Sequence, residues 1–206
     1  MTALLVLGLG LGLAILAALA IGVVVAFVKA PRTMLALSAV LALGIVSAWE
    51  LMLLAHHLGH PPGALDVTRR LYVSEESWGF GPGGNEAGFL AYALPESTAR
   101  QIDVEGLAWF DRLRDGRRGE GWRGRFGDWQ RTPVVADRRW QPDPSSGRME
   151  VLDYVCAYGF CIDIDQGQLR AAEDAVNGPG SYYAHGRIGL IVIVPRTRRV
   201  YFLYNG

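Results

Sequence analysis

The chain opens with ALLVLGLGLGLAILAALAIGVVVAFV at residues 3–28 and, after a short polar break, continues with MLALSAVLALGIVSAWELMLLA at residues 34–55. A helix needs roughly 20 predominantly apolar residues to cross a hydrocarbon layer about 30 Å thick. Both runs reach that length, and Glu50 is the only charged residue in either of them. The sequence therefore predicts a membrane region over residues 1–58, with transmembrane helices at about 3–28 and 34–56.

The short loop at residues 29–33 sets the predicted orientation of this helical hairpin. It carries Lys29 and Arg32, and Pro31 interrupts the helix. Short loops that hold Lys or Arg stay on the cytoplasmic side of a membrane. We therefore expect a multi-pass protein of a bacterial inner membrane, with a cytoplasmic loop and a periplasmic C-terminal domain. A cleaved signal peptide is the poorer interpretation, because the apolar core of such a peptide spans only about 7–15 residues.

Gly8 and Gly12 form a GxxxG pattern in the first apolar run. Small residues at this spacing let two helices approach closely within a lipid bilayer. We expect this face to pack against the second helix of the same hairpin. The alternative is that it mediates a homodimer.

A single α+β domain is predicted after the membrane region. His56, His57 and His60 are interpreted as a polar juxtamembrane segment rather than a metal site, and residues 59–68 as a linker. Residues 69–206 mix helical and strand patterns without a regular β-α-β rhythm, which favours the α+β class. The expected strands lie at 71–73, 88–94, 160–165, 188–194 and 200–204, and the expected helices at 95–113, 149–159 and 168–176.

Cys156 and Cys161 are the only cysteines of the chain. Two cysteines at this spacing predict a local disulfide if the domain lies in an oxidising compartment. Because the loop between them is short, the bridge would stabilise the fold by roughly 2 kcal/mol. The alternative is a pair of buried thiols that act as small hydrophobic residues.

No cofactor or metal site is predicted. The Gly-rich loop at residues 79–84 lacks both the Gly-Lys-Ser/Thr of a P-loop and the strand-to-helix context of a dinucleotide fingerprint. Asp163 and Asp165 resemble the start of a calcium loop, but Gln168 and Asp174 stand where that loop requires Gly and Glu. Asp165 is better explained as the N-cap of the helix that follows it.

Catalytic signatures are also absent from the sequence. It contains no G-x-S-x-G, H-E-x-x-H or S-x-x-K. His185 with Cys156 or Cys161 would resemble a Cys–His hydrolase, but that chemistry needs the free thiol that a disulfide removes. Carboxylates near the Gly-rich loop leave a membrane-tethered envelope hydrolase as the alternative. We therefore expect a protein that is not an enzyme.

The candidate partner-binding residues come from two segments, and they are Glu76, Asn85, Glu86, Trp122, Arg125 and Trp129. The first three flank the Gly-rich loop, whose glycines can adopt backbone angles closed to other residues. The others lie in a stretch rich in arginine and tryptophan, the residues most enriched at interface hot spots. The alternative interpretation places the two tryptophans in the core.

These features predict a membrane-anchored periplasmic binding module that works without catalysis. The partner would be a protein in the periplasm or membrane, which makes the chain an envelope-complex subunit or a toxin-neutralising immunity-type protein. Nucleic acid is not expected, because the domain is predicted to lie in the periplasm and acidic residues dilute the charge of the arginine-rich stretch, namely Asp111, Asp115, Glu120, Asp128 and Asp137. The alternatives are the envelope hydrolase and an accessory subunit of a transporter or channel, in which Glu50 would be the working residue.

Overall fold

The computed structural model describes residues 25, 28–78, 85–115, 126–138, 140–159, 161–186 and 189–205. The chain divides into two compact units, Met1–Leu53 and Leu54–Gly206. Most of the first apolar run, with Gly8 and Gly12, lies outside the described residues. The predicted two-helix hairpin and its glycine packing therefore stay predictions.

The second apolar run forms one long helix, α2 (Pro31–Leu58). It begins at the proline of the predicted loop, since proline is tolerated in the first turn of a helix. At 1.5 Å per residue its 28 residues measure roughly 42 Å, enough to cross a bilayer. Within the described part of the chain, α2 is the single helix with the length and composition of a membrane span.

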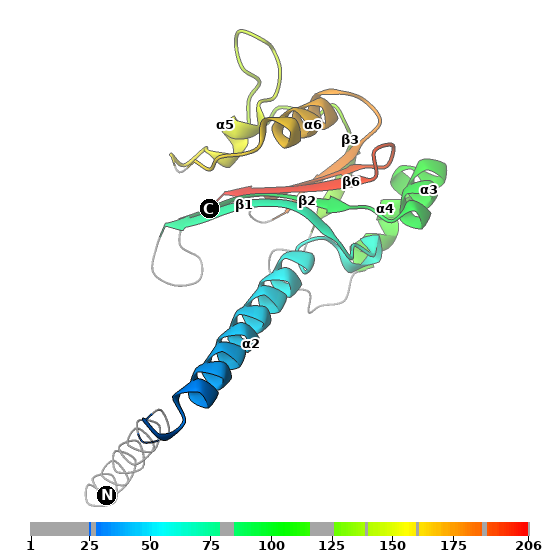
Figure 1. Ribbon diagram of the computed structural model, residues 1–206. Helices are drawn as coiled ribbons and strands as arrows, with labels where there is room; N and C mark the ends of the chain where they lie inside the picture. The colour runs from blue at the N-terminus through cyan, green and yellow to red at the C-terminus, as the bar shows by residue number, and fades with distance from the viewer. Residues whose placement is uncertain are drawn as a thin grey trace, which may run out of the picture. The chain divides into compact units, whose positions relative to one another are not determined.

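The second unit is built on one antiparallel sheet (Figure 1), so the predicted α+β class is confirmed. Its strand order is β1-β2-β6-β5-β4-β3. The strands are β1 (Arg70–Trp78), β2 (Asn85–Ala93), β3 (Gly127–Arg131), β4 (Tyr182–His185), β5 (Gly189–Val194) and β6 (Arg199–Asn205). The helices are α3 (Glu96–Glu105), α4 (Leu107–Asp111), α5 (Val151–Val155) and α6 (Gln166–Asn177), with short 3₁₀ turns at Gly63–Leu65 and Arg112–Asp115.

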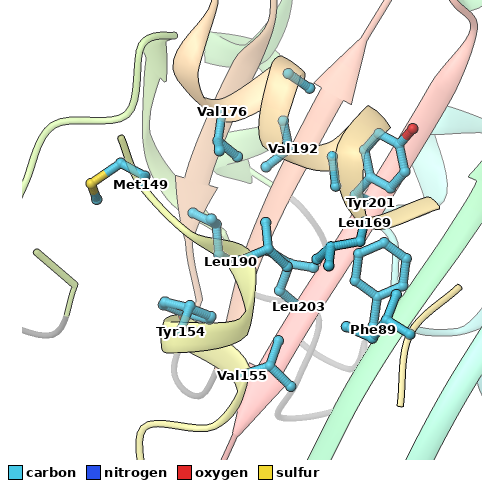
Figure 2. Packing of buried hydrophobic residues seen from close by; sticks show 14 of the residues in the cluster. Phe89, Met149, Tyr154, Val155, Leu169, Val176, Leu190, Val192, Tyr201 and Leu203 are labelled. Carbon is cyan, nitrogen blue, oxygen red and sulfur yellow. The ribbon is translucent and has the colours of Figure 1, made fainter. Parts of the chain in front are cut away.

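The sheet has a hydrophobic core on each of its two faces. Successive side chains of a strand point to opposite faces, so a strand covered on both sides is apolar throughout. Strand β5 is buried at all its positions for this reason. On one face, α5 and α6 cover Phe89, Tyr201 and Leu203 (Figure 2). On the other face, α3 and α4 pack with Leu90 and Phe202.

Several element boundaries differ from those that the sequence predicts. The helix expected over 95–113 is broken at Gly106, whose φ of 61° ends α3 before α4 begins. The expected strand at 160–165 is wrong, because no strand pairing is present at 161–165. Ile162 and Ile164 alternate with polar residues because their side chains are buried in the core on one face of the sheet. Burial of this kind does not require the segment to pair with a strand. Strands β3 and β4 were not expected.

Two local predictions are confirmed. Cys156 and Cys161 form a disulfide, with their Cα atoms 4.6 Å apart. Asp165 caps α6, and its side chain accepts hydrogen bonds from the backbone N–H groups of Gly167 and Gln168. Both features depend on residues close together in the sequence, where local geometry decides the contact.

A row of residues across three strands constrains the sheet near its edge. Glu75 of β1 pairs with Gly88 of β2, which in turn pairs with Tyr204 of β6. The Tyr204 ring lies against Gly88 so closely that a Cβ added there would stand 2.2 Å from Cε1 of the ring. Only glycine at position 88 therefore lets the Tyr204 side chain cross β2 toward Glu75.

Gly88→Ala should destabilise the fold, because the new methyl group would displace the Tyr204 ring. Overpacking of this kind costs about 1–3 kcal/mol. Thermal unfolding of the full chain in detergent would measure the loss. Gly127→Ala in β3 is the matched control, since nothing lies within 4 Å of the added Cβ. Equal melting temperatures of the two variants would contradict the prediction.

Candidate functional site

Four polar side chains form a connected group where α2 enters the second unit. They are His57, Arg70, Glu75 and Tyr204, and we call them the His57–Glu75 cluster. His57 lies in the last turn of the apolar helix α2, and it is only 1% exposed. Buried polar side chains are stable only where they are hydrogen-bonded, so the partners within the cluster decide whether this arrangement holds.

The hydrogen bonds of the cluster assign the tautomer of His57. Arg70 approaches Nδ1 of His57 through Nη1, and a guanidinium group can only donate. Nδ1 must therefore accept, and the ring proton resides on Nε2, which lies 2.5 Å from Oε2 of Glu75. The other carboxylate oxygen of Glu75 accepts a hydrogen bond from the Tyr204 hydroxyl. The imidazole is thus held between a cation and an anion.

A second tyrosine joins the helix end to the sheet. The hydroxyl of Tyr92 donates to the backbone carbonyl of His57 at 2.8 Å. The last carbonyls of a helix have no partner within the helix, and a side-chain donor can supply one. Burial, together with the charge of Glu75, raises the pKa of Tyr92 despite the opposing effect of Arg70. Tyr92 therefore keeps its proton and remains a donor.

The environment of Glu75 favours the carboxylate form. Burial alone would raise its pKa, but the hydrogen bonds from His57 and Tyr204 and the attraction of the His57 and His60 imidazoles outweigh that effect. The pKa of Glu75 is lowered from 4.5 to about 2 as a result. A general acid or base works best with a pKa near the operating pH. Glu75 is thus suited to hold its neighbours in place rather than to transfer a proton.

The predicted acidic residues are not brought together on one surface. Glu76 pairs across the strands with Ala87, and Ser77 pairs with Glu86. Because neighbouring side chains on a strand point to opposite faces, Glu76 and Glu86 lie on opposite faces of the sheet. Asn85 is the first residue of β2.

The tryptophan-rich part of the predicted surface is only partly described. Trp122 and Arg125 lie outside the described residues. Trp129 belongs to β3, at the opposite edge of the sheet from β1, so with strands about 4.8 Å apart roughly 24 Å separate the two edges. Its half-buried ring stacks on Phe110, with ring centroids 4.3 Å apart. Trp129 therefore packs against the core, and substituting it would disturb folding as well as any binding.

The segment predicted as a linker is packed into the second unit. Pro61, Pro62 and Leu65 are all buried, and Leu65 belongs to the core on the α3 side of the sheet. His60 is also buried, with its ring 5.1 Å from that of Phe202. The chain that leaves α2 thus runs directly into the hydrophobic core of the domain.

The sequence pattern marks His57 as part of a polar juxtamembrane segment but does not connect it with Glu75. The signal that could have done so is the position of Glu75 within a strand whose neighbours are half-buried. A carboxylate there needs a donor from outside the strand, and the juxtamembrane histidines are the nearest candidates in the sequence. Tyr204 gives no such signal, since 129 residues separate it from Glu75.

Neither a metal arrangement nor a known family identifies this site. Within the described ranges, no group of three or more His, Cys, Asp or Glu side chains is placed to hold a metal ion. No protein-family model matches the chain, and no curated protein or solved structure matches it either. What the site can do follows from the geometry of its own side chains.

Glu75 should make the stability of the protein depend on pH in acid. Its folded-state pKa lies below its ordinary value of 4.5, so its contribution is complete above about pH 4.5 and is lost as the pH falls toward 2. The shift corresponds to a contribution on the order of 3 kcal/mol. We expect Glu75→Gln to lower the melting temperature at neutral pH and to flatten its decline in acid.

Glu76→Gln is the control for this measurement. Glu76 is the next residue on the same strand, but it is exposed and its side chain points to the other face. Its substitution should leave the pH dependence of the melting temperature unchanged. If Glu75→Gln and Glu76→Gln melt alike from neutral pH down to pH 2.5, the stabilising role of Glu75 is refuted.

Proposed function

We propose that this protein is a membrane-anchored binding module whose C-terminal domain lies outside the cytoplasm and acts without catalysis. The observation that carries the proposal is the His57–Glu75 cluster. It makes the last turn of the apolar helix α2 a structural part of the domain, through a partly buried hydrogen bond from Arg70 and a buried one from Tyr92. A domain that begins within the last turn of its apolar helix is suited to binding a partner beside the membrane.

The disulfide supports the extracytoplasmic location. Cys156 and Cys161 are bridged, and structural disulfides persist in oxidising compartments but are rare in the cytoplasm. The predicted cytoplasmic loop with Lys29 and Arg32 points to the same side. Two independent features thus favour a periplasmic domain on a protein of the inner membrane.

The geometry gives less support to the alternative of an envelope hydrolase. A glycoside hydrolase needs two carboxyl groups that flank the scissile bond on one site. Glu76 and Glu86 lie on opposite faces of the sheet, and Glu75 is held as an anion by its hydrogen bonds. A binding role needs no such pair. The partner would be a protein of the envelope, either a resident subunit or a toxin that the module neutralises.

The proposed location can be tested with fusions and with thiol labelling. A C-terminal alkaline phosphatase fusion should be active, and a C-terminal GFP fusion should not fluoresce. Neither cysteine should react with maleimide until the membrane fraction is reduced. As a labelling control, Cys156→Ser and Cys161→Ser combined with Ser146→Cys place one accessible thiol at an exposed position. Labelling of the native cysteines without reduction would refute the proposed compartment.

The proposed partner can be tested by photo-crosslinking in cells. With benzoylphenylalanine in place of the exposed Glu76 or the half-exposed Glu86, we expect a discrete product of higher mass in the envelope fraction. The same substitution at Val104, which is 86% exposed on α3, serves as the control position. The binding proposal fails if neither position gives a product, or if Val104 gives the same one. The identity of the crosslinked protein distinguishes a resident subunit from a toxin.

A further inference from the structure

Two adjoining hollows lie at the end of the sheet where β5 turns into β6. The larger has a volume of about 630 Å³ and lies between α6, the loop after it and the β5–β6 turn. The smaller, of about 450 Å³, lies between the same turn and the start of β1. Both are lined by Thr197 and Arg199, so they adjoin at the β5–β6 turn, and we call the two hollows together the Arg199 groove. Its volume falls in the range of small-molecule sites.

Cationic side chains without ion pairs line this groove. Arg196 and Arg199 lie in the larger hollow and Arg69 in the smaller one. Among the described residues, none of these three arginines has a carboxylate within ion-pair distance. A guanidinium group presents five N–H donors in a planar fork that fits carboxylate and phosphate oxygens. The groove thus offers positive charge that the described part of the protein does not neutralise.

The acidic residues beside the groove are already engaged elsewhere. Asp174 forms an ion pair with Arg148 at 3.3 Å. Glu96 forms ion pairs with both Arg100 and Arg198. Asp174 is therefore paired with an arginine outside the groove, and Glu96 with Arg100 outside it and with Arg198 on the wall of the smaller hollow.

A tyrosine hydroxyl adds a hydrogen-bonding group to the wall of the larger hollow. Tyr201 lines the larger hollow and is only 2% exposed. Its ring contacts Phe89, and Figure 2 shows its hydroxyl oxygen at the end of the ring that points away from Phe89. Within the described ranges this hydroxyl has no hydrogen-bond partner. It is not among the buried side-chain atoms that lack a partner, so it reaches the open space of the hollow and can donate to an acceptor bound there.

Ser181 and the start of α6 complete the polar wall. Ser181 is 3% exposed, and its hydroxyl also lacks a partner among the residues described. The first backbone N–H groups of α6 are already bonded to Asp165, so the helix terminus is not the source of free donors. Val194, Pro179 and the alanines of α6 form the apolar remainder of the wall.

We propose that the Arg199 groove binds a small organic anion, with its carboxylate or phosphate group at Arg196, Arg199 and the Tyr201 hydroxyl and its less polar part against α6. The carboxylate or phosphate group accepts hydrogen bonds, and the two arginines and the Tyr201 hydroxyl can donate them. This site goes beyond the proposed partner-binding role and does not depend on it, because the groove lies wholly within the second unit.

Isothermal titration calorimetry of the full chain in dodecyl maltoside tests the proposal. The probes are phenyl phosphate, phenylacetate and inorganic phosphate, with phenylacetamide as a neutral control of similar shape. We expect one binding site per chain for phenyl phosphate or phenylacetate, and at least about tenfold weaker binding of phenylacetamide, because hydrogen bonds to charged groups are the stronger ones. The two organic anions distinguish phosphate from carboxylate, and inorganic phosphate shows whether the apolar wall contributes.

Two substitutions locate the site. Arg199→Gln should weaken binding of the preferred anion about tenfold or more, whereas Arg170→Gln should not change it. Arg170 is an exposed arginine of α6 that does not line either hollow, and its side chain donates to the carbonyl of Gln166. The proposal is overturned if no anion binds more tightly than phenylacetamide, or if the two variants bind alike.

Tyr201→Phe separates a ligand-binding role from a structural one. Because the hydroxyl has no partner in the described structure, removing it should leave the melting temperature equal or higher. The same substitution should weaken binding of the anion several-fold. A lower melting temperature with unchanged anion binding would show that the hydroxyl serves the fold, and it would refute its assigned role.

Discussion

A carboxylate that is partly buried needs hydrogen-bond donors. Glu75 receives them from the last turn of α2 and from β6, the last strand in sequence order. His57 and Tyr204 both donate to it. For Tyr204 to reach Glu75, its ring must cross β2, which requires Gly88 between them. Arg70 donates to the other ring nitrogen of His57, which assigns the ring proton to Nε2. One partly buried anion thus connects the glycine at position 88, the tautomer of His57 and the last turn of α2.

The sequence predicts those parts of this fold that depend on short-range patterns. The α+β class, the strands at β5 and β6, the cap at Asp165 and the bridge between Cys156 and Cys161 all follow from residues near one another. The alternation of Ile162 and Ile164 with polar residues led to the wrong prediction of a strand at 160–165. Alternation shows that one side of a segment is buried, but it does not show that the segment pairs with another strand. Strand β3 gives almost no alternating pattern, since four of its five residues are exposed.

The functional groups are harder to predict than the elements that carry them. The contacts of Glu75 span 18 residues to His57 and 129 to Tyr204. Neither partner is marked by spacing, because the strand order β1-β2-β6 that unites them is decided by packing of the whole sheet. For the same reason, the predicted partner-binding residues do not lie together on one surface. Glu76 and Trp129 belong to strands at opposite edges of the sheet.

Two tyrosines of β6 illustrate the difference between the His57–Glu75 cluster and the Arg199 groove. Tyr201 and Tyr204 are both 2% exposed, and their positions on the strand direct them to opposite faces. Tyr204 donates to Glu75, so its burial is compensated within the fold. Tyr201 has no such acceptor among the described residues, and its hydroxyl reaches the larger hollow of the Arg199 groove instead. A phenylalanine would fill the same space as the ring but could not donate into the hollow, so in the proposed site the hydroxyl serves an acceptor that arrives from outside, beside arginines able to hold it.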